Sequence, residues 1–335
     1  MAEPKFLVVR LGSLGDIVHA FPAVAALRET FPNCKIVWLT HPRWRELVSS
    51  GGVATEIWEV ETRSFASVRE IRQKIRKENF SAAIDYQGLW KSALLPFLSR
   101  VPRRIGFSSG SVREFGVPLL YTDQVHARSV HVVDMNGELS MYAGATKPTA
   151  CFSMTVSPEA RATVRGMLNS NSIEDYIVLS PGGGWISKCW PAERFGALAS
   201  RLRSELDVRC VINYGPGEEN LAEQVDTASG NAGPVSYSGT FGELMALLRG
   251  ARCVIAGDTG PMHLADALGA KVVAIFGPTD PERNGPYLGR LTGRTIVLRV
   301  EDVEPTYKRE DATHPSLLRI SVEQVLEAAR KLEAQ

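Results

Sequence analysis

The sequence predicts an α/β protein with two doubly wound, parallel-sheet domains, and three observations support this fold class. Short apolar runs, such as Lys35 to Thr40 and Tyr176 to Ser180, alternate with stretches of helical periodicity along the chain. Repeated strand–helix units of this length are typical of parallel sheets covered by helices on both faces. The chain has 335 residues, which is long for one hydrophobic core and comfortable for two. Glycine-rich polar loops also follow several expected strands, at the sheet edge where such folds bind ligands.

Composition and charge argue against several other classes of protein. Apolar residues make up 44% of the chain and charged residues 22%, which is ordinary for a globular protein. The formal net charge of +1 gives no support for nucleic-acid binding. The five cysteines are scattered without a CxxC pair, so we expect a reducing cytoplasm and neither a disulfide framework nor a metal site. No apolar run reaches the roughly eighteen residues that a membrane-spanning helix needs.

The amino-terminal domain is expected to span residues 1–160 and to alternate between strands and helices. A glycine-hinged turn, LGSLGD, follows the first strand, and the helical pattern begins at Ile17. Asp16 at the start of that helix is either a helix cap or a general base, and the residues alone leave both roles open. The expected strands are Lys5–Arg10, Lys35–Thr40, Thr55–Val60, Ser81–Gln87 and Arg104–Phe107, and the helices between them cover Arg43–Ser49, Phe65–Glu78 and Lys91–Ser99.

Two arginines of this domain, Arg63 and Arg113, flank loops instead of lying in a run of helical charges. A guanidinium group matches a carboxylate or a phosphate bidentately, so each residue is a candidate for binding an anionic substrate. The alternative is that each is an ordinary solvated charge. The residues alone do not choose between these two interpretations.

The carboxyl-terminal domain is expected to cover residues 161–320. An amphipathic helix over residues 321–335 follows it, since apolar residues recur on one side of this segment. This helix is expected to pack back toward the first domain. The region before the boundary reads as a strand over Cys151–Val156 and a helix that starts at Ser157. The other expected strands are Tyr176–Ser180, Val208–Tyr214, Arg252–Ala256 and Lys271–Phe276, with helices that start at Trp190 and cover Phe241–Arg249.

Two loops of this domain carry features of an anion site. Three consecutive glycines, Gly182 to Gly184, follow the strand that ends at Ser180 and permit the backbone dihedrals of an anion-binding concavity. Lys188 comes shortly after them, where it either contacts phosphate or is a solvated lysine. Glu218, on the loop after the following strand, either holds ribose hydroxyls or lies at a helix start as a stabilising carboxylate.

The stretch from Val254 to Gly269, VIAGDTGPMHLADALG, has the strongest site pattern in the chain. An apolar strand breaks at Gly257-Asp258-Thr259-Gly260, and a helix follows with a proline near its first position. Backbone N–H groups at the positive end of a helix dipole suit a diphosphate, and Thr259 and His263 add side-chain donors. A second polar loop, Gly277 to Asp280, ends the next strand. We interpret this edge as a nucleotide site, and the alternative is a well-capped helix.

Five segments in this order resemble those of the bacterial lipopolysaccharide heptosyltransferases, the family-nine glycosyltransferases of GT-B architecture. They are RLGSLGDIVHAFPAV, DYQGLWKS, PGGGWISKCWP, GDTGPMHLADALG and FGPTDPERNGPY. The likeness covers essentially the whole chain and is closest to the subfamily that adds the first heptose to the Kdo of the inner core. It implies two Rossmann-like domains that face a central cleft, with the acceptor bound by the first and ADP-heptose by the second. The segment Glu304–Arg319 lacks the cysteines of many relatives, which argues against the iron-binding, protein-modifying heptosyltransferases.

The resemblance also implies roles for individual residues. Asp16 matches the catalytic base, which would accept the proton of an acceptor hydroxyl while ADP departs, so that displacement is direct and inverting. No cofactor and no metal is implied. The implied donor-binding residues are Gly183, Gly184, Lys188, Glu218, Asp258, Thr259, Gly260 and His263, and the implied acceptor-binding residues are Ser13, Arg63, Gln87 and Arg113.

The function that follows is transfer of heptose from ADP-L-glycero-β-D-manno-heptose to Kdo–lipid A. The expected location is the cytoplasm, with peripheral association with the inner membrane left open. The alternatives are heptosyltransferase II or another family-nine transferase, a sugar-nucleotide epimerase of the same shape, and a nucleotide-sugar sensor without catalysis. An epimerase would interconvert a sugar nucleotide without an acceptor, and a sensor would tolerate the loss of Asp16. Contacts to phosphate and ribose do not choose the donor sugar.

Overall fold

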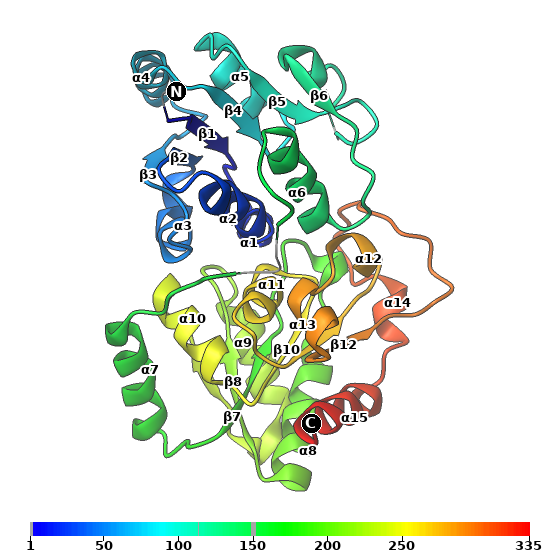
Figure 1. Ribbon diagram of the computed structural model, residues 1–335. Helices are drawn as coiled ribbons and strands as arrows, with labels where there is room; N and C mark the ends of the chain where they lie inside the picture. Colours follow the sequence, from blue (N-terminus) through cyan, green and yellow to red (C-terminus); the bar gives the residue numbers. More distant parts are fainter. Residues whose placement is uncertain (1–2, 113, 149–151) are drawn as a thin grey trace. The chain divides into compact units, whose positions relative to one another are not determined.

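The structure, a computed structural model, describes residues 3–112, 114–148 and 152–335. The chain divides into two compact units, Met1–Thr155 and Val156–Gln335. The boundary expected from the sequence lies at residue 160. Each unit contains a six-stranded sheet whose strands all pair in parallel, with helices packed on the sheet (Figure 1). The predicted class of two doubly wound parallel sheets is confirmed, and the predicted cleft between the domains stays a prediction.

The sheet of the first unit has the strand order β3-β2-β1-β4-β5-β6. Its central strands are continuous apolar runs because both faces of a parallel sheet are covered. The central strands β1 and β4 pair in register as far as Val9 and Asp85, so the loops that follow them leave the sheet side by side. The strands are β1 (Lys5–Val9), β2 (Lys35–Thr40), β3 (Glu56–Glu59), β4 (Ala82–Asp85), β5 (Arg104–Phe107) and β6 (Asp123–Val125).

The helices of the first unit lie on both faces of this sheet (Figure 1). Ile71 and Ile75 of α4 and Leu95 of α5 share one apolar core with Leu7 and Val9 of β1. Helices α2 and α6 pack against each other, and Figure 1 places them on the opposite face. The helices are α1 (Leu14–Val18), α2 (Phe21–Thr30), α3 (Arg45–Ser50), α4 (Phe65–Glu78), α5 (Trp90–Leu98) and α6 (Val132–Tyr142), with two short 3-10 helices, η1 (Pro42–Trp44) and η2 (Val117–Leu120).

The sheet of the second unit has the order β12-β11-β10-β7-β8-β9. Strand β10 lies between β11 and β7, with Gly257 opposite Ile275 and Ala256 opposite Ser180. The loops after these three strands therefore emerge next to one another. The strands are β7 (Tyr176–Ser180), β8 (Arg209–Asn213), β9 (Val235–Tyr237), β10 (Cys253–Gly257), β11 (Val272–Ile275) and β12 (Thr295–Leu298).

The last helix of the chain, α15, is part of the second unit. Its apolar residues Val325, Leu326, Ala329 and Leu332 join the core formed around strands of this sheet, and its packing toward the first domain stays a prediction. The helices of this unit are α7 (Pro158–Ser170), α8 (Ala192–Leu206), α9 (Glu219–Ala228), α10 (Phe241–Gly250), α11 (Gly260–Ala267), α12 (Pro281–Asn284), α13 (Tyr287–Thr292), α14 (Pro315–Leu318) and α15 (Val322–Glu333), with η3 (Ile186–Lys188) and η4 (Gly230–Ala232).

Several elements differ from the sequence-based expectation. The helix expected from Ile17 is two helices, because Pro22 has no N–H with which to continue the bonding to Val18. The strand expected at Cys151–Val156 is wrong for residues 152–156, which form no strand, and Cys151 lies outside the described residues. Helix α6 was not expected, since it contains the pair Asn136-Gly137, which is typical of turns. Strands β6 and β9 were also missed, since each has three residues and no apolar run.

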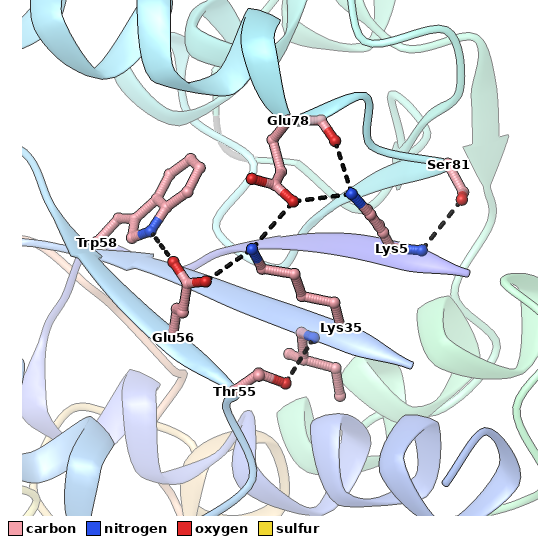
Figure 2. A network of polar contacts seen from close by, with 8 residues as sticks. Lys5, Lys35, Thr55, Glu56, Trp58, Glu78 and Ser81 are labelled. Atoms are coloured by element: carbon pink, nitrogen blue, oxygen red, sulfur yellow. Dashed lines mark hydrogen bonds and ion pairs between the residues drawn. The ribbon is translucent and has the colours of Figure 1, made fainter. Parts of the chain in front are cut away.

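A network of ion pairs lies at the amino-terminal edge of the first sheet (Figure 2). Lys35 Nζ lies 2.6 Å from Glu56 and 3.0 Å from Glu78, and Lys5 Nζ lies 3.0 Å from the same Glu78 carboxylate. Trp58 Nε1 donates to Glu56 over 2.8 Å. The lysine and glutamate side chains connect the first residues of the strands to the end of α4 and are partly exposed, whereas Trp58 is buried. They lie at the edge opposite to the one that carries Asp16.

Candidate active site

Asp258 follows β10 directly and lies within a buried polar cluster of the second unit. Its side chain is 4% exposed and forms an ion pair with Lys188 Nζ through Oδ2. Thr279 Oγ1 donates to the same oxygen over 2.7 Å, and His263 Nε2 lies 3.3 Å from Oδ1. Lys188, Asp258 and Thr279 follow the neighbouring strands β7, β10 and β11, so the parallel order of the sheet brings them together.

The surroundings of Asp258 decide its charge. Burial by itself would raise the pKa of this carboxyl, because a carboxylate loses its hydration inside a protein. The hydrogen bond to His263 and the positive charge of Lys188 outweigh that effect and hold the pKa of Asp258 well below its usual range. Asp258 is therefore ionised at neutral pH. A buried carboxylate with these partners orients them and is poorly suited to accept a further proton.

Lys188 is a buried cation instead of a solvated surface lysine. The residue is 9% exposed, and lysine is rarely this buried unless it is paired. Its Nζ lies 4.2 Å from the centroid of the Trp185 ring, at the distance of a cation–π interaction. An ammonium group has three donors, and the pair with Asp258 uses one of them. The remaining donors are available to an anion.

The amino terminus of α11 adds further donors beside this lysine. Thr259 is its N-cap residue and Gly260 its first helical residue. Thr259 is 7% exposed, and its hydroxyl has no hydrogen-bond partner among the residues that the structure describes. The first N–H groups of a helix have no partner within the helix and carry its positive end. An anion bound here would satisfy the Thr259 hydroxyl and the first-turn N–H groups together.

The glycine loop after β7 lies against this same edge. A Cβ atom on Gly182 would come within 2.2 Å of Glu218 Oε1, so this backbone touches the Glu218 carboxylate. A Cβ on Gly183 would lie 3.5 Å from the Thr259 side chain, while Gly184 is exposed and borders open space. Glu218 Oε2 accepts the Gly215 N–H over 2.7 Å at the start of α9. All eight residues with an implied donor role are therefore carried by the ends of neighbouring strands β10, β7 and β8 or the loops and helix that follow them.

Asp16 of the first unit has a different environment. Its side chain is 42% exposed, and Oδ1 lies 2.6 Å from Arg10 Nη2, whose side chain is 7% exposed. Ser13 donates both its backbone N–H, over 3.0 Å, and its hydroxyl, over 3.1 Å, to Oδ2. Asp16 thus stabilises the start of α1, as its helix-cap interpretation expects. The same carboxylate is also open to solvent, which a proton acceptor for a bound substrate requires.

Gln87 lies beside the Asp16 loop, because β4 pairs with β1. Its Oε1 accepts the Leu11 N–H over 2.8 Å and so connects the two loops. Ser13 is exposed at the same edge, and Arg63 is exposed in the turn before α4. Arg113 lies outside the described residues. Roles for these four residues in acceptor binding stay predictions.

Three further polar residues, two in the first unit and one in the second, hold loops of the candidate site and were not predicted from the sequence. Arg10 is a buried arginine whose guanidinium pairs with Asp16 and donates to the Tyr86 carbonyl. Asp85 is buried and accepts the Gln87 N–H over 2.9 Å and hydrogen bonds from two side-chain hydroxyls, and burial raises its pKa. Thr279 donates to Asp258. Each is a polar residue at the end of an apolar strand, or within four residues of it, and that signal was available in the sequence.

Two features of the described chain are relevant to function classes. Among residues 3–112, 114–148 and 152–335, no group of three or more His, Cys, Asp or Glu side chains is placed to hold a metal ion. Within the same residues no helix is both long enough and apolar enough to cross a membrane. Neither observation by itself identifies the reaction.

Comparison with known proteins adds to this geometry. Residues 68–315 match the family model described as glycosyltransferase family 9 (heptosyltransferase). Lipopolysaccharide heptosyltransferase 1 of Escherichia coli K12 is 26% identical over 298 residues, which is 84% of this chain and 91% of the relative. Lipopolysaccharide heptosyltransferase 3 of the same organism is 24% identical over 279 residues, which is 79% of this chain and 80% of the relative.

Solved structures show the same fold at low identity. The E. coli ADP-heptose lps heptosyltransferase II has a TM-score of 0.81 at 21% identity and covers 99% of each chain. The E. coli heptosyltransferase WaaC with ADP-2-deoxy-2-fluoro heptose has a TM-score of 0.74 at 22% identity and covers 98% of this chain and 99% of that chain. The predicted GT-B architecture is confirmed by these likenesses.

Proposed function

Because the chain belongs to glycosyltransferase family 9, the heptosyltransferases, we propose that it transfers heptose from ADP-L-glycero-β-D-manno-heptose to a Kdo residue of the lipopolysaccharide inner core. The observation that carries the proposal is the buried cluster of the second unit, where Lys188 is paired with Asp258 beside the amino terminus of α11. This arrangement combines a positive side chain with N–H groups at one sheet edge, which suits the diphosphate of a nucleotide sugar. The WaaC structure that contains an ADP-heptose analogue supports the choice of donor.

The donor half of the reaction is assigned to the second unit. Lys188 and the N–H groups at Gly260 bind the diphosphate, and the Thr259 hydroxyl donates to it. Glu218, next to the glycine loop, accepts from the ribose hydroxyls. Asp258 and His263 hold Lys188 and the start of α11 in place. The backbone at Gly183 and Gly184 lets the diphosphate approach closely.

The acceptor half is assigned to the first unit. Asp16 accepts the proton of the Kdo hydroxyl as the acceptor oxygen forms its bond to the anomeric carbon. Arg10 keeps this carboxylate in position, and Ser13 and Gln87 line the same edge. Arg63 and Arg113 bind the carboxylate and phosphate groups of the acceptor.

The transfer of heptose from ADP to the acceptor hydroxyl is a single displacement in which charge and atoms balance. The bond between the anomeric carbon and ADP breaks while the new glycosidic bond forms on the opposite face, so the configuration inverts. The negative charge that develops on ADP is stabilised by Lys188 and the helix N–H groups, and a positioned base such as Asp16 typically contributes about 10²–10⁴-fold. The reaction takes place in the cytoplasm at the inner membrane, where the acceptor lipid is presented.

Product masses test this proposal directly. The purified protein is incubated with ADP-heptose and either Kdo–lipid A or the same acceptor already carrying one heptose, and the products are analysed by mass spectrometry. We expect one added heptose on Kdo–lipid A only. Transfer to the heptosylated acceptor alone would mean that the protein adds the second heptose. Interconversion of ADP-heptose without an acceptor would mean that the protein is an epimerase and not a transferase.

A further inference from the structure

Five apolar side chains are exposed together on one surface of the first unit. Phe115 is 100% exposed and Leu119 81%, while three side chains of α5 are exposed by about 40%. Exposed apolar patches of this kind mark interaction sites, because isolated domains normally bury such groups. We call this surface the α5–η2 patch, and it comprises Trp90, Phe97, Leu98, Phe115 and Leu119.

Direct contacts make the patch one surface. The backbone N–H of Trp90 donates to Glu114 over 2.6 Å, and a Cβ on Gly116 would lie 3.1 Å from the Trp90 ring. The loop that carries Phe115 therefore lies against the start of α5. The Leu119 N–H in turn donates to the Gly116 carbonyl over 3.1 Å.

Arginine side chains join the other end of the patch. Arg104 Nε donates to the Leu120 carbonyl over 2.7 Å, and its guanidinium lies 5.4 Å from the Phe97 ring centroid. Arg72 and Arg76 of α4 donate to the Leu98 carbonyl over 2.9 and 3.0 Å. Guanidinium groups thus surround the carboxyl-terminal end of α5, where Phe97 and Leu98 are exposed.

The charge of these arginines is not neutralised. The ion pairs found among the described residues include none of Arg72, Arg76 and Arg104, whose hydrogen bonds go to backbone carbonyls. Each guanidinium has five N–H donors, so most remain available to oxygen ligands. Lys91 and Arg100, at the two ends of α5, are exposed as well. The patch is therefore apolar and cationic at once.

We propose that the α5–η2 patch docks the protein on an anionic lipid bilayer, with Phe115, Leu119 and Trp90 inserted among the lipids and the arginines on the phosphates. Amphipathic surfaces with aromatic side chains and a basic rim bind membrane interfaces in this way. A second copy of the chain is a poor occupant, since a two-fold interface would set the same arginines against each other. The inference rests on the proposed function for its lipid acceptor.

One end of the patch lies at the sheet edge assigned to the acceptor, and the arginine end, with Arg104 at the start of β5, lies toward the opposite edge. Trp90 opens α5 a few residues after β4, and Phe115 lies on the loop after β5. Both residues are therefore at the carboxyl-terminal edge of the sheet, the edge that carries Gln87 and Asp16. Docking here would bring an acceptor that is embedded in the bilayer to the acceptor loops without its extraction from the membrane.

Vesicle sedimentation of the full chain tests the surface. The protein is mixed with phosphatidylcholine vesicles that contain or lack phosphatidylglycerol, and the bound fraction is measured. We expect binding to the anionic vesicles only, and we expect the double variant Phe115→Ser/Leu119→Ser to lower the partition coefficient at least ~tenfold. The matched control Leu291→Ser/Leu318→Ser, which removes two exposed leucines of the second unit, should bind as the wild type does.

Three outcomes would overturn the proposal: no vesicle binding by the wild type, equal binding by the Phe115→Ser/Leu119→Ser variant, or a wild-type dimer that this variant converts to a monomer. Transfer to a lipid-free, Kdo-terminated acceptor is measured in parallel and should be unchanged in the variant. If the protein binds vesicles through the patch but transfers no heptose, the proposed function is refuted and the docking proposal still holds.

Discussion

The two units each present an aspartate at the carboxyl-terminal edge of a parallel sheet, and the two aspartates have opposite environments. Asp258 is 4% exposed and is held by Lys188, His263 and Thr279. Asp16 is 42% exposed, pairs with Arg10 and accepts hydrogen bonds from Ser13. The same residue type at the same place in the fold thus has different surroundings in the two units. A buried carboxylate with several partners is suited to ordering a binding site, whereas a carboxylate exposed to solvent is accessible to a substrate proton, as the proposed roles of Asp258 and Asp16 require.

The largest expected effect follows from removing the proton acceptor. Asp16→Asn keeps one oxygen, which can still accept from Ser13, and asparagine caps helices about as well as aspartate; its amide group replaces the oxygen that pairs with Arg10. Heptose transfer should fall by at least ~10²-fold, the low end for a positioned base. Turnover measured from ADP release is compared with Asp123→Asn, which breaks a partly exposed pair with Arg103 in the same unit and should stay near wild type. Near-normal transfer by Asp16→Asn would leave this residue a helix cap only.

The next effect concerns the buried cation. Lys188→Gln retains a donor for Asp258 and removes the positive charge, so ADP binding should weaken by about 1.5–3 kcal/mol, the size of a hydrogen bond to a charged group. Isothermal titration calorimetry with ADP measures this directly. Unchanged affinity in a folded Lys188→Gln protein would exclude the lysine from the donor site.

A smaller effect is expected on the pH dependence of stability. The folded-state pKa of Asp258 lies below its ordinary value, so the stabilisation that its ionised form provides is present above about pH 4, the usual aspartate pKa, and is lost as pH falls toward the folded pKa. Urea unfolding of wild type and Asp258→Asn at several pH values should therefore show a stability difference that shrinks below pH ~4. A difference that does not depend on pH would mean that the charge of Asp258 contributes nothing to stability.

The smallest effect is expected at the amino-terminal edge of the first sheet. Lys35→Gln removes the charge shared by Glu56 and Glu78 (Figure 2), and partly exposed pairs of this kind contribute roughly 0.2–1 kcal/mol. It is the matched control for Lys188→Gln, and ADP affinity should not change. Loss of ADP binding in Lys35→Gln would show that lysine-to-glutamine changes act through the fold instead of the site.

The fold class and the position of the strand-end loops that carry the candidate site could be predicted from the sequence, because apolar runs and glycine-hinged turns are local signals. Tyr176–Ser180 and Phe65–Glu78 were predicted with the bounds that the structure has. The sequence also placed the loops after Gly257 and Phe276 at one edge, but the individual side-chain contacts between loops were not predictable. The contact of Thr279 with Asp258 depends on β10 and β11 being neighbours, and the burial of Lys188 depends on the return of the glycine loop to the same edge. Such contacts arise from the strand order, which no local pattern encodes.

The separation of the proposed base, Asp16, from the proposed donor site around Asp258 and Lys188 is tested most directly by two variants, Asp16→Asn and Lys188→Gln. ADP affinity by calorimetry and transfer rate are measured on both. We predict that Asp16→Asn binds ADP as the wild type does while its transfer rate falls by at least ~10²-fold. Lys188→Gln should lose ADP affinity by roughly tenfold or more. An Asp16→Asn protein that loses ADP affinity as much as it loses rate would contradict the separation of base and donor site. Retention of full ADP affinity by Lys188→Gln would contradict it equally.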